Sequence, residues 1–188
     1  SIGYLKASPN REKIASAKSH INSEVQIFDF NAATGVISNP ITIANYAQNT
    51  AGAYGCEFSP DSRLLYVSEI IGTNNNQDTS KIHQYDITLP TEAQIANSDI
   101  IITEEDGQLG AIQQALDGKL YVAKFNQSSI CVINKPNEIG TASDYQSETV
   151  FLGGEVSRLG LPPFIQSYFF ATNVFNNTCF GDATEFFI

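Results

Sequence analysis

A chain of 188 residues that is 42% hydrophobic and only 16% charged is long enough for one globular domain and too apolar to be disordered. Its 20 Asp and Glu outnumber 10 Lys and Arg, and a net charge of −10 opposes binding to nucleic-acid phosphates. We therefore expect no nucleic-acid partner. No run reaches the roughly 18 apolar residues that a membrane-spanning helix needs, so we also expect no membrane insertion. The 12 Phe and 8 Tyr, with Trp and Met absent, favour strands over helices.

A hairpin pattern recurs three times along the chain. Residues 5–16 recur as 56–68 and, more weakly, as 112–123. Each copy is a short strand, a turn rich in Ser, Pro, Asp, Asn or Gly, and a second strand of β-branched and aromatic residues. The pair at 117–118 is Asp-Gly, a strong tight-turn signal because Gly tolerates a positive φ.

Two more strands follow each hairpin. Residues 25–30, 82–87 and 130–134 alternate apolar and polar side chains, which is the period of a half-buried strand. These segments close on Asp29, Asp86 and Asn134, whose side chains we expect to cap the following turn rather than to act in catalysis. A weaker fourth strand is predicted in each copy, over 41–43, 100–102 and 149–152.

Four strands in about fifty residues, three times over, are typical of propeller blades. The pattern predicts an all-β fold with almost no helix. This fold is a β-propeller fragment of about three to three and a half four-stranded blades. Complete propellers carry about 4–8 blades, and a fourth blade begins at 160–170, so we expect further sequence before Ser1. The expected strands cover 3–6, 13–18, 25–30, 41–44, 54–59, 64–69, 81–87, 99–103, 110–115, 119–125, 129–134 and 149–152.

Several segments resemble a known group of proteins. Residues 58–68 resemble the WD40-like repeat of bacterial seven-bladed surface propellers and lactonase-like propellers. Further segments resemble the propeller region of large secreted gliding-motility-associated, PKD-domain proteins of Gram-negative bacteria. These segments are 84–90, 132–137, 160–169 and 177–184.

The resemblance implies a seven-bladed propeller when complete and a secreted or outer cell-surface location. It also implies two regions, a partial propeller over 1–172 and, over 173–188, a linker with the first strand of a PKD or immunoglobulin-like module. Cys179 would then pair with a cysteine beyond Ile188; the alternative is that Cys179 is a small buried hydrophobe. The family supplies no catalytic residues that match positions of this chain.

The residue types that carry chemistry are scarce. The two histidines, His20 and His83, are expected in a loop and at an outward-facing strand position, and no nucleophile-elbow sequence accompanies them. Cys56, Cys131 and Cys179 are too few and too scattered for a disulfide framework or a zinc site. We therefore predict no catalytic residues, no cofactor and no tightly bound metal.

Two acidic or polar segments have simpler interpretations than metal binding. The loop at 74–79 spaces oxygen ligands as calcium loops do, but it lacks the glycine at its sixth place, and Tyr85 stands where a bidentate Glu is needed. The acidic segment 104–107 is expected to be a solvated turn.

The aromatic side chains are open to two interpretations, a carbohydrate-stacking surface or packing between blades. Most of them occupy repeated strand positions, which favours packing. The set consists of Tyr4, Phe58, Tyr66, Tyr85, Tyr121, Phe125, Tyr168, Phe169 and Phe170.

Three classes of function remain. The first is a non-catalytic interaction or display module for a protein or glycan ligand, because loops at the ends of a rigid propeller can vary freely. The second is a lactonase-like hydrolase, which would bring several ionisable side chains together at the central channel. The third is glycan binding, which would show an exposed aromatic cluster.

The predicted fragment also leaves two blade faces uncovered. We expect these faces to include Leu5, Ile14, Phe164 and Tyr168. Because monomers rarely expose large apolar patches, the open propeller edges predict self-association.

Overall fold

The computed structural model describes residues 2–19, 22–46, 52–72, 78–162, 177–179 and 182–184. Twelve of its strands form three four-stranded antiparallel sheets, each a simple meander in chain order. The first sheet contains β1 (Gly3–Ala7), β2 (Lys13–Lys18), β3 (Glu24–Asn31) and β4 (Val36–Asn45). The second contains β5 (Gly52–Phe58), β6 (Leu64–Ile71), β7 (Thr79–Asp86) and β8 (Ile100–Asp106). The third contains β9 (Leu109–Gln114), β10 (Leu120–Lys124), β11 (Ser129–Ile133) and β12 (Tyr145–Phe151).

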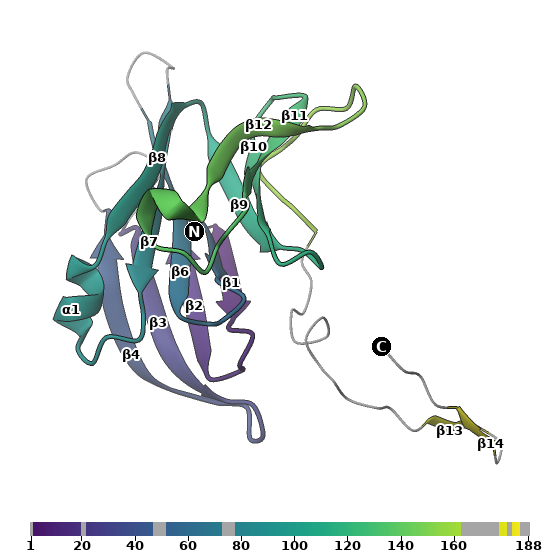
Figure 1. Ribbon diagram of the computed structural model, residues 1–188. Coiled ribbons are helices and arrows are strands. Elements are labelled where there is room, and N and C mark those ends of the chain that lie inside the picture. The colour runs from purple at the N-terminus through teal and green to yellow at the C-terminus, as the bar shows by residue number, and fades with distance from the viewer. Residues whose placement is uncertain are drawn as a thin grey trace.

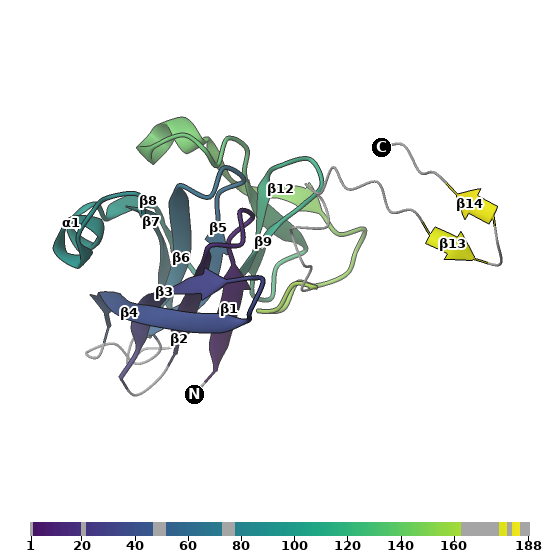
Figure 2. The ribbon, with the colours of Figure 1, turned by 90° about the horizontal axis from the view of Figure 1, so that it is seen from below.

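The three sheets fan out from their first strands (Figures 1 and 2). β1 packs beside β5, and β5 packs beside β9, while β4, β8 and β12 are the outermost strands. One apolar core lies between the first and second sheets and includes Val25, Phe58 and Val67. A second core lies between the second and third sheets and includes Leu64 and Ile112. This arrangement is consistent with part of a propeller, each sheet corresponding to one blade.

The three repeated turns are built alike, which confirms the sequence repeat. Asn10, Asp61 and Asp117 each accept, through Oδ1, the backbone N–H two residues on, at 3.1 Å in all three turns. In the first two copies the preceding serine, Ser8 or Ser59, also accepts an N–H from the start of the next strand. The side chains therefore close the hairpins locally and fix the register of the strands that follow.

The outer connections, which join the third strand of a sheet to its fourth strand, contact the preceding sheet in the second and third sheets. The connection after β7 carries the six-residue helix α1 (Glu92–Asn97), which begins at the N-cap Thr91 and packs against β4 of the first sheet. The connection after β11 carries the short 3-10 helix η1 (Gly140–Ser143), which lies against β8 of the second sheet. α1 and η1 lie outside the repeated segments, as the strand prediction requires.

The second and third sheets approach closely where glycine faces backbone. A Cβ on Gly55 would lie 2.5 Å from the Gly110 carbonyl oxygen, and one on Gly110 would lie 2.3 Å from that of Leu159. Gly110 and Gly55 therefore permit backbone contacts that no side chain would allow.

The far face of the first sheet has no further sheet on it among the described residues. Leu5 on this face is 65% exposed, as expected, but Ile14 is only 7% exposed, so the expectation of an open position there was wrong. Its cross-strand neighbours, Ala7 on one side and Phe28 on the other, lie on the same face of the sheet. Phe164 and Tyr168, the other predicted positions, lie outside the described residues.

Near the C-terminus, β13 (Asn177–Cys179) pairs with β14 (Asp182–Thr184) as a separate two-stranded sheet. The described part of the chain contains no helix long and apolar enough to span a membrane.

Candidate binding groove

His83 is the one described histidine, and it is buried rather than outward-facing. It is 4% exposed, and its Nδ1 lies 2.9 Å from Asp99 Oδ1 while its Nε2 lies 3.1 Å from Glu69 Oε2. The rings of Tyr46, from the end of the first sheet, and Tyr85 lie 5.5 and 6.2 Å away. His83 on β7 thus links Glu69 of β6 to Asp99, which directly precedes β8. The Tyr46 ring, from the first sheet, packs on the imidazole. His20 lies outside the described residues.

These contacts set the charge of His83. Burial alone would lower the pKa of His83, but hydrogen bonds and charges from Asp99 and Glu69 raise it from 6.5 to about 9. Burial raises the pKa values of Tyr46 and Tyr85, so both phenols stay neutral. Lys81, two residues before His83, forms its own ion pair with Glu104 at 3.7 Å. A protonated imidazole held by two carboxylates is a structural link and a poor general base.

The stability of the chain is therefore expected to fall as the pH rises from 6.5 to 9. A folded-state pKa above the unfolded value means that the His83 contribution is complete below pH 6.5 and is lost through pH 9. We expect a loss of about 2 kcal/mol, allowing for solvent at the partly exposed Asp99. Urea unfolding at a series of pH values measures it. The His83→Gln variant should remove this slope, and an unchanged slope in that variant would contradict the assignment.

A second polar cluster lies where the first strands of the three sheets meet. Lys6 Nζ lies 3.1 Å from Glu57 Oε2 and donates to Gln113 Oε1 at 2.5 Å. Each of the three residues precedes its repeated turn by the same spacing, so they are one repeat position in three copies. All three are 7% exposed or less, and Glu57 also accepts the backbone N–H groups of Phe58 and Gln114. We call this the channel cluster.

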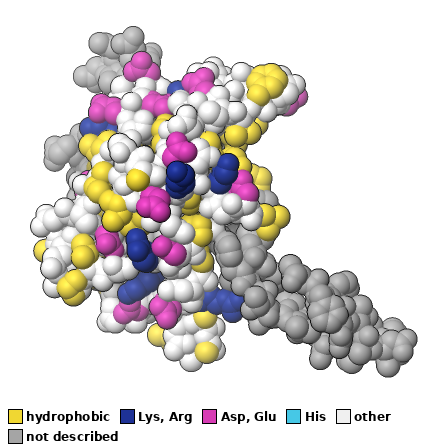
Figure 3. All heavy atoms as spheres, in the orientation of Figure 1, with side chains coloured by type: hydrophobic (Ala, Val, Ile, Leu, Met, Phe, Trp, Pro, Cys, Tyr) yellow, Lys and Arg dark blue, Asp and Glu magenta, His cyan; other side chains and the backbone are white. Residues whose placement is uncertain are grey.

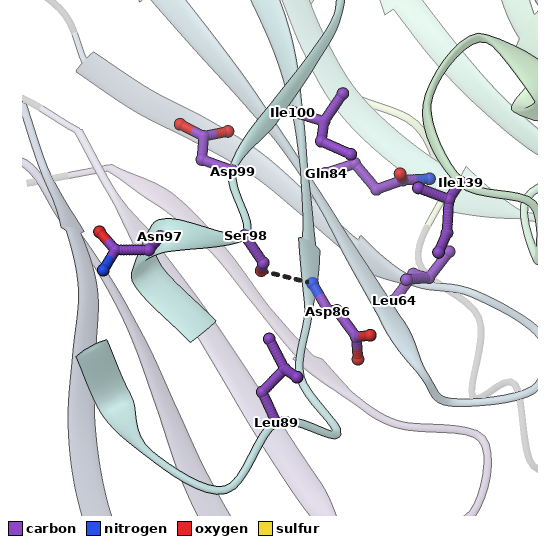
Figure 4. Close-up of a pocket in the computed structure, with 9 residues that line it drawn as sticks. All are labelled: Leu64, Gln84, Asp86, Leu89, Asn97, Ser98, Asp99, Ile100 and Ile139. Carbon is purple, nitrogen blue, oxygen red and sulfur yellow. Dashed lines mark hydrogen bonds between the residues drawn. The ribbon is translucent and has the colours of Figure 1, made fainter. Parts of the chain in front are cut away.

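A groove of about 320 Å³ lies on the outer side of the second and third sheets (Figure 4). Leu64 and Leu89 form its apolar floor, and Ile100 and Ile139 stand at one side of it. Ile100 is 37% exposed and Ile139 52% exposed. The remaining lining residues are Gln84, Asp86, Asn97, Ser98 and Asp99. Hydrophobic side chains lie among Asp and Glu side chains across the face shown in Figure 3.

The groove is built from the outer connections. Gln84 on β7 donates to the carbonyl oxygen of Glu138 at 2.8 Å and accepts the N–H of Gly140 at 2.8 Å, which fixes the strand-to-strand loop that carries Ile139. On the other side, Ser98 after α1 accepts the Asp86 N–H at 2.9 Å and donates to the carbonyl oxygen of Ile95 at 2.6 Å. The β11–β12 connection of the third sheet and the β7–β8 connection of the second sheet thus form the two sides of the groove.

The carboxylates at the groove have different roles. Asp86 Oδ1 accepts both the backbone N–H and the hydroxyl of Thr88, which confirms the predicted capping role. Its carboxylate lies between Leu64 and Leu89, whereas the carboxylate of Asp99 points away from Ile100 and Ile139 (Figure 4). Asp29 instead pairs with Lys13, and Asn134 donates to the carbonyl oxygen of Asp144, so the capping prediction was wrong for these two.

The other predicted residues add no chemical centre. Cys56 and Cys131 are buried free thiols, and burial raises the pKa of Cys56 to about 12, so that thiol is unreactive. Phe58, Tyr66 and Tyr85 are fully buried, which confirms packing over stacking for these three. No group of residues suited to a metal occurs in the described ranges, and residues 73–77 of the polar loop lie outside them.

Sequence reasoning missed the channel cluster and Ile139. The channel cluster had a signal, since Lys6, Glu57 and Gln113 are polar residues at one repeated position of three inner strands. Ile139 had no signal in the sequence, because its place in the groove depends on the hydrogen bond between Gly140 and Gln84 of β7, which are 56 residues apart in the chain.

Comparisons with known proteins bear on the fold alone. No protein-family model matches the chain, and no curated protein does either. A crystal structure of glucose dehydrogenase is similar, with a TM-score of 0.50 and 15% sequence identity over 77% of this chain and 49% of that one. The chain thus spans about half the length of that structure. At this identity the similarity extends to the architecture and not to the activity.

Proposed function

We propose that this chain is a non-catalytic interaction module, part of a seven-bladed propeller in a larger secreted or outer cell-surface protein. Its contact site is the groove between Leu89 and Ile139. The observation that supports this most is the exposure of Ile100 and Ile139 beside the apolar floor, since aliphatic side chains at a concave surface favour a partner over water.

The ionisable clusters support the same choice. An enzyme needs groups that can exchange protons with a substrate, whereas Lys6 and Glu57 neutralise each other and His83 is held as a cation between two carboxylates. The Lys6–Glu57 pair joins the first and second sheets, and the His83 pairs join strands within the second sheet, so both have a structural role.

Selection of a random twelve-residue peptide library on the purified chain tests the proposal. We expect peptides that bind the wild-type chain and bind the Ile139→Asp variant at least tenfold more weakly, because the new carboxylate removes an aliphatic side and adds charge. Binding is measured by fluorescence anisotropy with labelled synthetic peptides.

Leu116→Asp is the matched control. Leu116 is 76% exposed on a repeated turn and does not line the groove, so this variant should bind the selected peptides as the wild type does. Equal circular dichroism spectra and melting temperatures show that both variants fold. Peptides that bind regardless of Ile139, or no selected peptides at all, would show that the groove is not the contact site.

The channel cluster favours one second candidate, a propeller-type hydrolase. A carboxylate, an ammonium group and an amide converge there from three sheets, which is the arrangement expected of a channel site. Their burial and mutual pairing make this the weaker candidate. Turnover of a lactone by the wild type, lost in Glu57→Gln, would favour it.

A further inference from the structure

We propose that the groove binds a protein segment that presents an aliphatic side chain next to a Lys or Arg. This inference rests on the proposed function, and it names the chemistry of the partner.

The aliphatic part follows from what the groove offers. Its polar side chains are largely engaged within the chain: Gln84 donates to Tyr66 and to the carbonyl oxygen of Glu138 and accepts from Gly140, and Ser98 both donates and accepts. A ligand therefore meets the surfaces of Leu89, Ile100 and Ile139, with the buried Leu64 beneath them. Placing a Leu, Ile or Val side chain there removes apolar surface from water, which favours binding.

The basic part follows from the charges that remain unpaired. Asp99 pairs with His83 and Asp61 pairs with Arg63, so those carboxylates are already neutralised. Asp86 lies in the groove and Glu138 precedes Ile139, and neither forms an ion pair among the described residues. Of the Asp86 oxygens, Oδ1 holds Thr88 and Oδ2 has no partner in the described part of the chain. The free carboxylate oxygen of Asp86, beside an aliphatic surface, favours a cation on the ligand.

Other classes of ligand fit less well. A sugar in the groove would place hydroxyl groups against the aliphatic side chains of Leu89, Ile100 and Ile139, where they lose hydrogen bonds to water. Nucleic acid is repelled by the free carboxylate of Asp86, and the lining contains no aromatic ring on which a base could stack. A peptide segment with one aliphatic and one cationic side chain meets both features.

The test uses the peptides selected on the wild-type chain that depend on Ile139. We expect them to carry a Lys or Arg within two residues of a Leu, Ile or Val. Replacing that cation by Gln should weaken binding to the wild-type chain about fivefold to tenfold, and Asp86→Asn should weaken binding of the parent peptide by a similar factor. Combining the two changes should add little, because both remove the same interaction.

Asp117→Asn is the matched control for Asp86→Asn. Both carboxylates accept an N–H two residues on through Oδ1, and an amide oxygen can keep that bond in each variant. Asp117→Asn should change the affinity less than twofold. Additive losses, or selected peptides that need Ile139 but show neither a cation nor a dependence on Asp86, would overturn this inference while leaving the proposed function standing. Peptides that ignore Ile139 would remove the proposed function itself.

Discussion

Replacing Glu57 by alanine is expected to lower the free energy of unfolding by about 3–5 kcal/mol. Glu57 is fully buried, and its carboxylate lies 3.1 Å from the ammonium group of Lys6, which is itself 7% exposed. Removing the carboxylate leaves a buried cation with no anionic partner in the described part of the chain. It also leaves the N–H groups of Phe58 and Gln114 without the Glu57 acceptor. Urea unfolding followed by circular dichroism measures the loss.

Two controls separate burial from charge. Asp29→Ala breaks the Lys13–Asp29 pair, whose side chains are 37% and 41% exposed, and should cost no more than about 1 kcal/mol. The double change Lys6→Met with Glu57→Gln removes both charges and keeps an acceptor, so it should cost clearly less than Glu57→Ala alone. If Glu57→Ala costs no more than Asp29→Ala, the channel cluster does not join the sheets.

Gly55→Ala is expected to lower the free energy of unfolding by about 3 kcal/mol. The new Cβ would lie 2.5 Å from the Gly110 carbonyl oxygen and 3.0 Å from both Ala111 Cα and Ile112 N. All three atoms belong to the backbone of β9, so the second and third sheets would have to move apart. The same unfolding experiment measures the effect.

Gly118→Ala provides the comparison for Gly55→Ala. Gly118 has a φ of +76° in its turn, and a Cβ there meets nothing within 4 Å. Its substitution should therefore cost only the strain of the left-handed backbone, about 1–2 kcal/mol. Equal losses in the two variants would mean that the sheets tolerate the wider spacing.

The strands could be predicted because their signals are local. All twelve predicted strands are present, and the largest differences lie at β4 and β12, which begin before residues 41 and 149. The turns at Asn10, Asp61 and Asp117 close through side-chain contacts that span two residues, so a short stretch of sequence contains all the information.

The burial of His83 and the groove could not be predicted in this way. Alternation assigns His83 to one face of β7, but the side chain that covers it, Tyr46, comes from the preceding sheet. The loop at Ile139 is likewise placed by Gln84, 56 residues before Gly140 in the chain. Contacts between sheets depend on how the repeats are stacked, and no period within a single repeat reports that stacking.

Because the outer connections contact the preceding sheet, the segment that must be transferred to move the groove to another propeller is not a single repeat. The second repeat supplies β7, Asp86 and Leu89, while Ile139 comes from the third repeat. A graft that transfers one whole repeat would therefore carry only part of the groove. A recombination boundary placed inside a sheet, so that the transferred segment runs from β6 through η1, would keep all the groove-lining residues together. In chains built this way, the groove belongs to parts of two neighbouring repeats and to neither repeat alone.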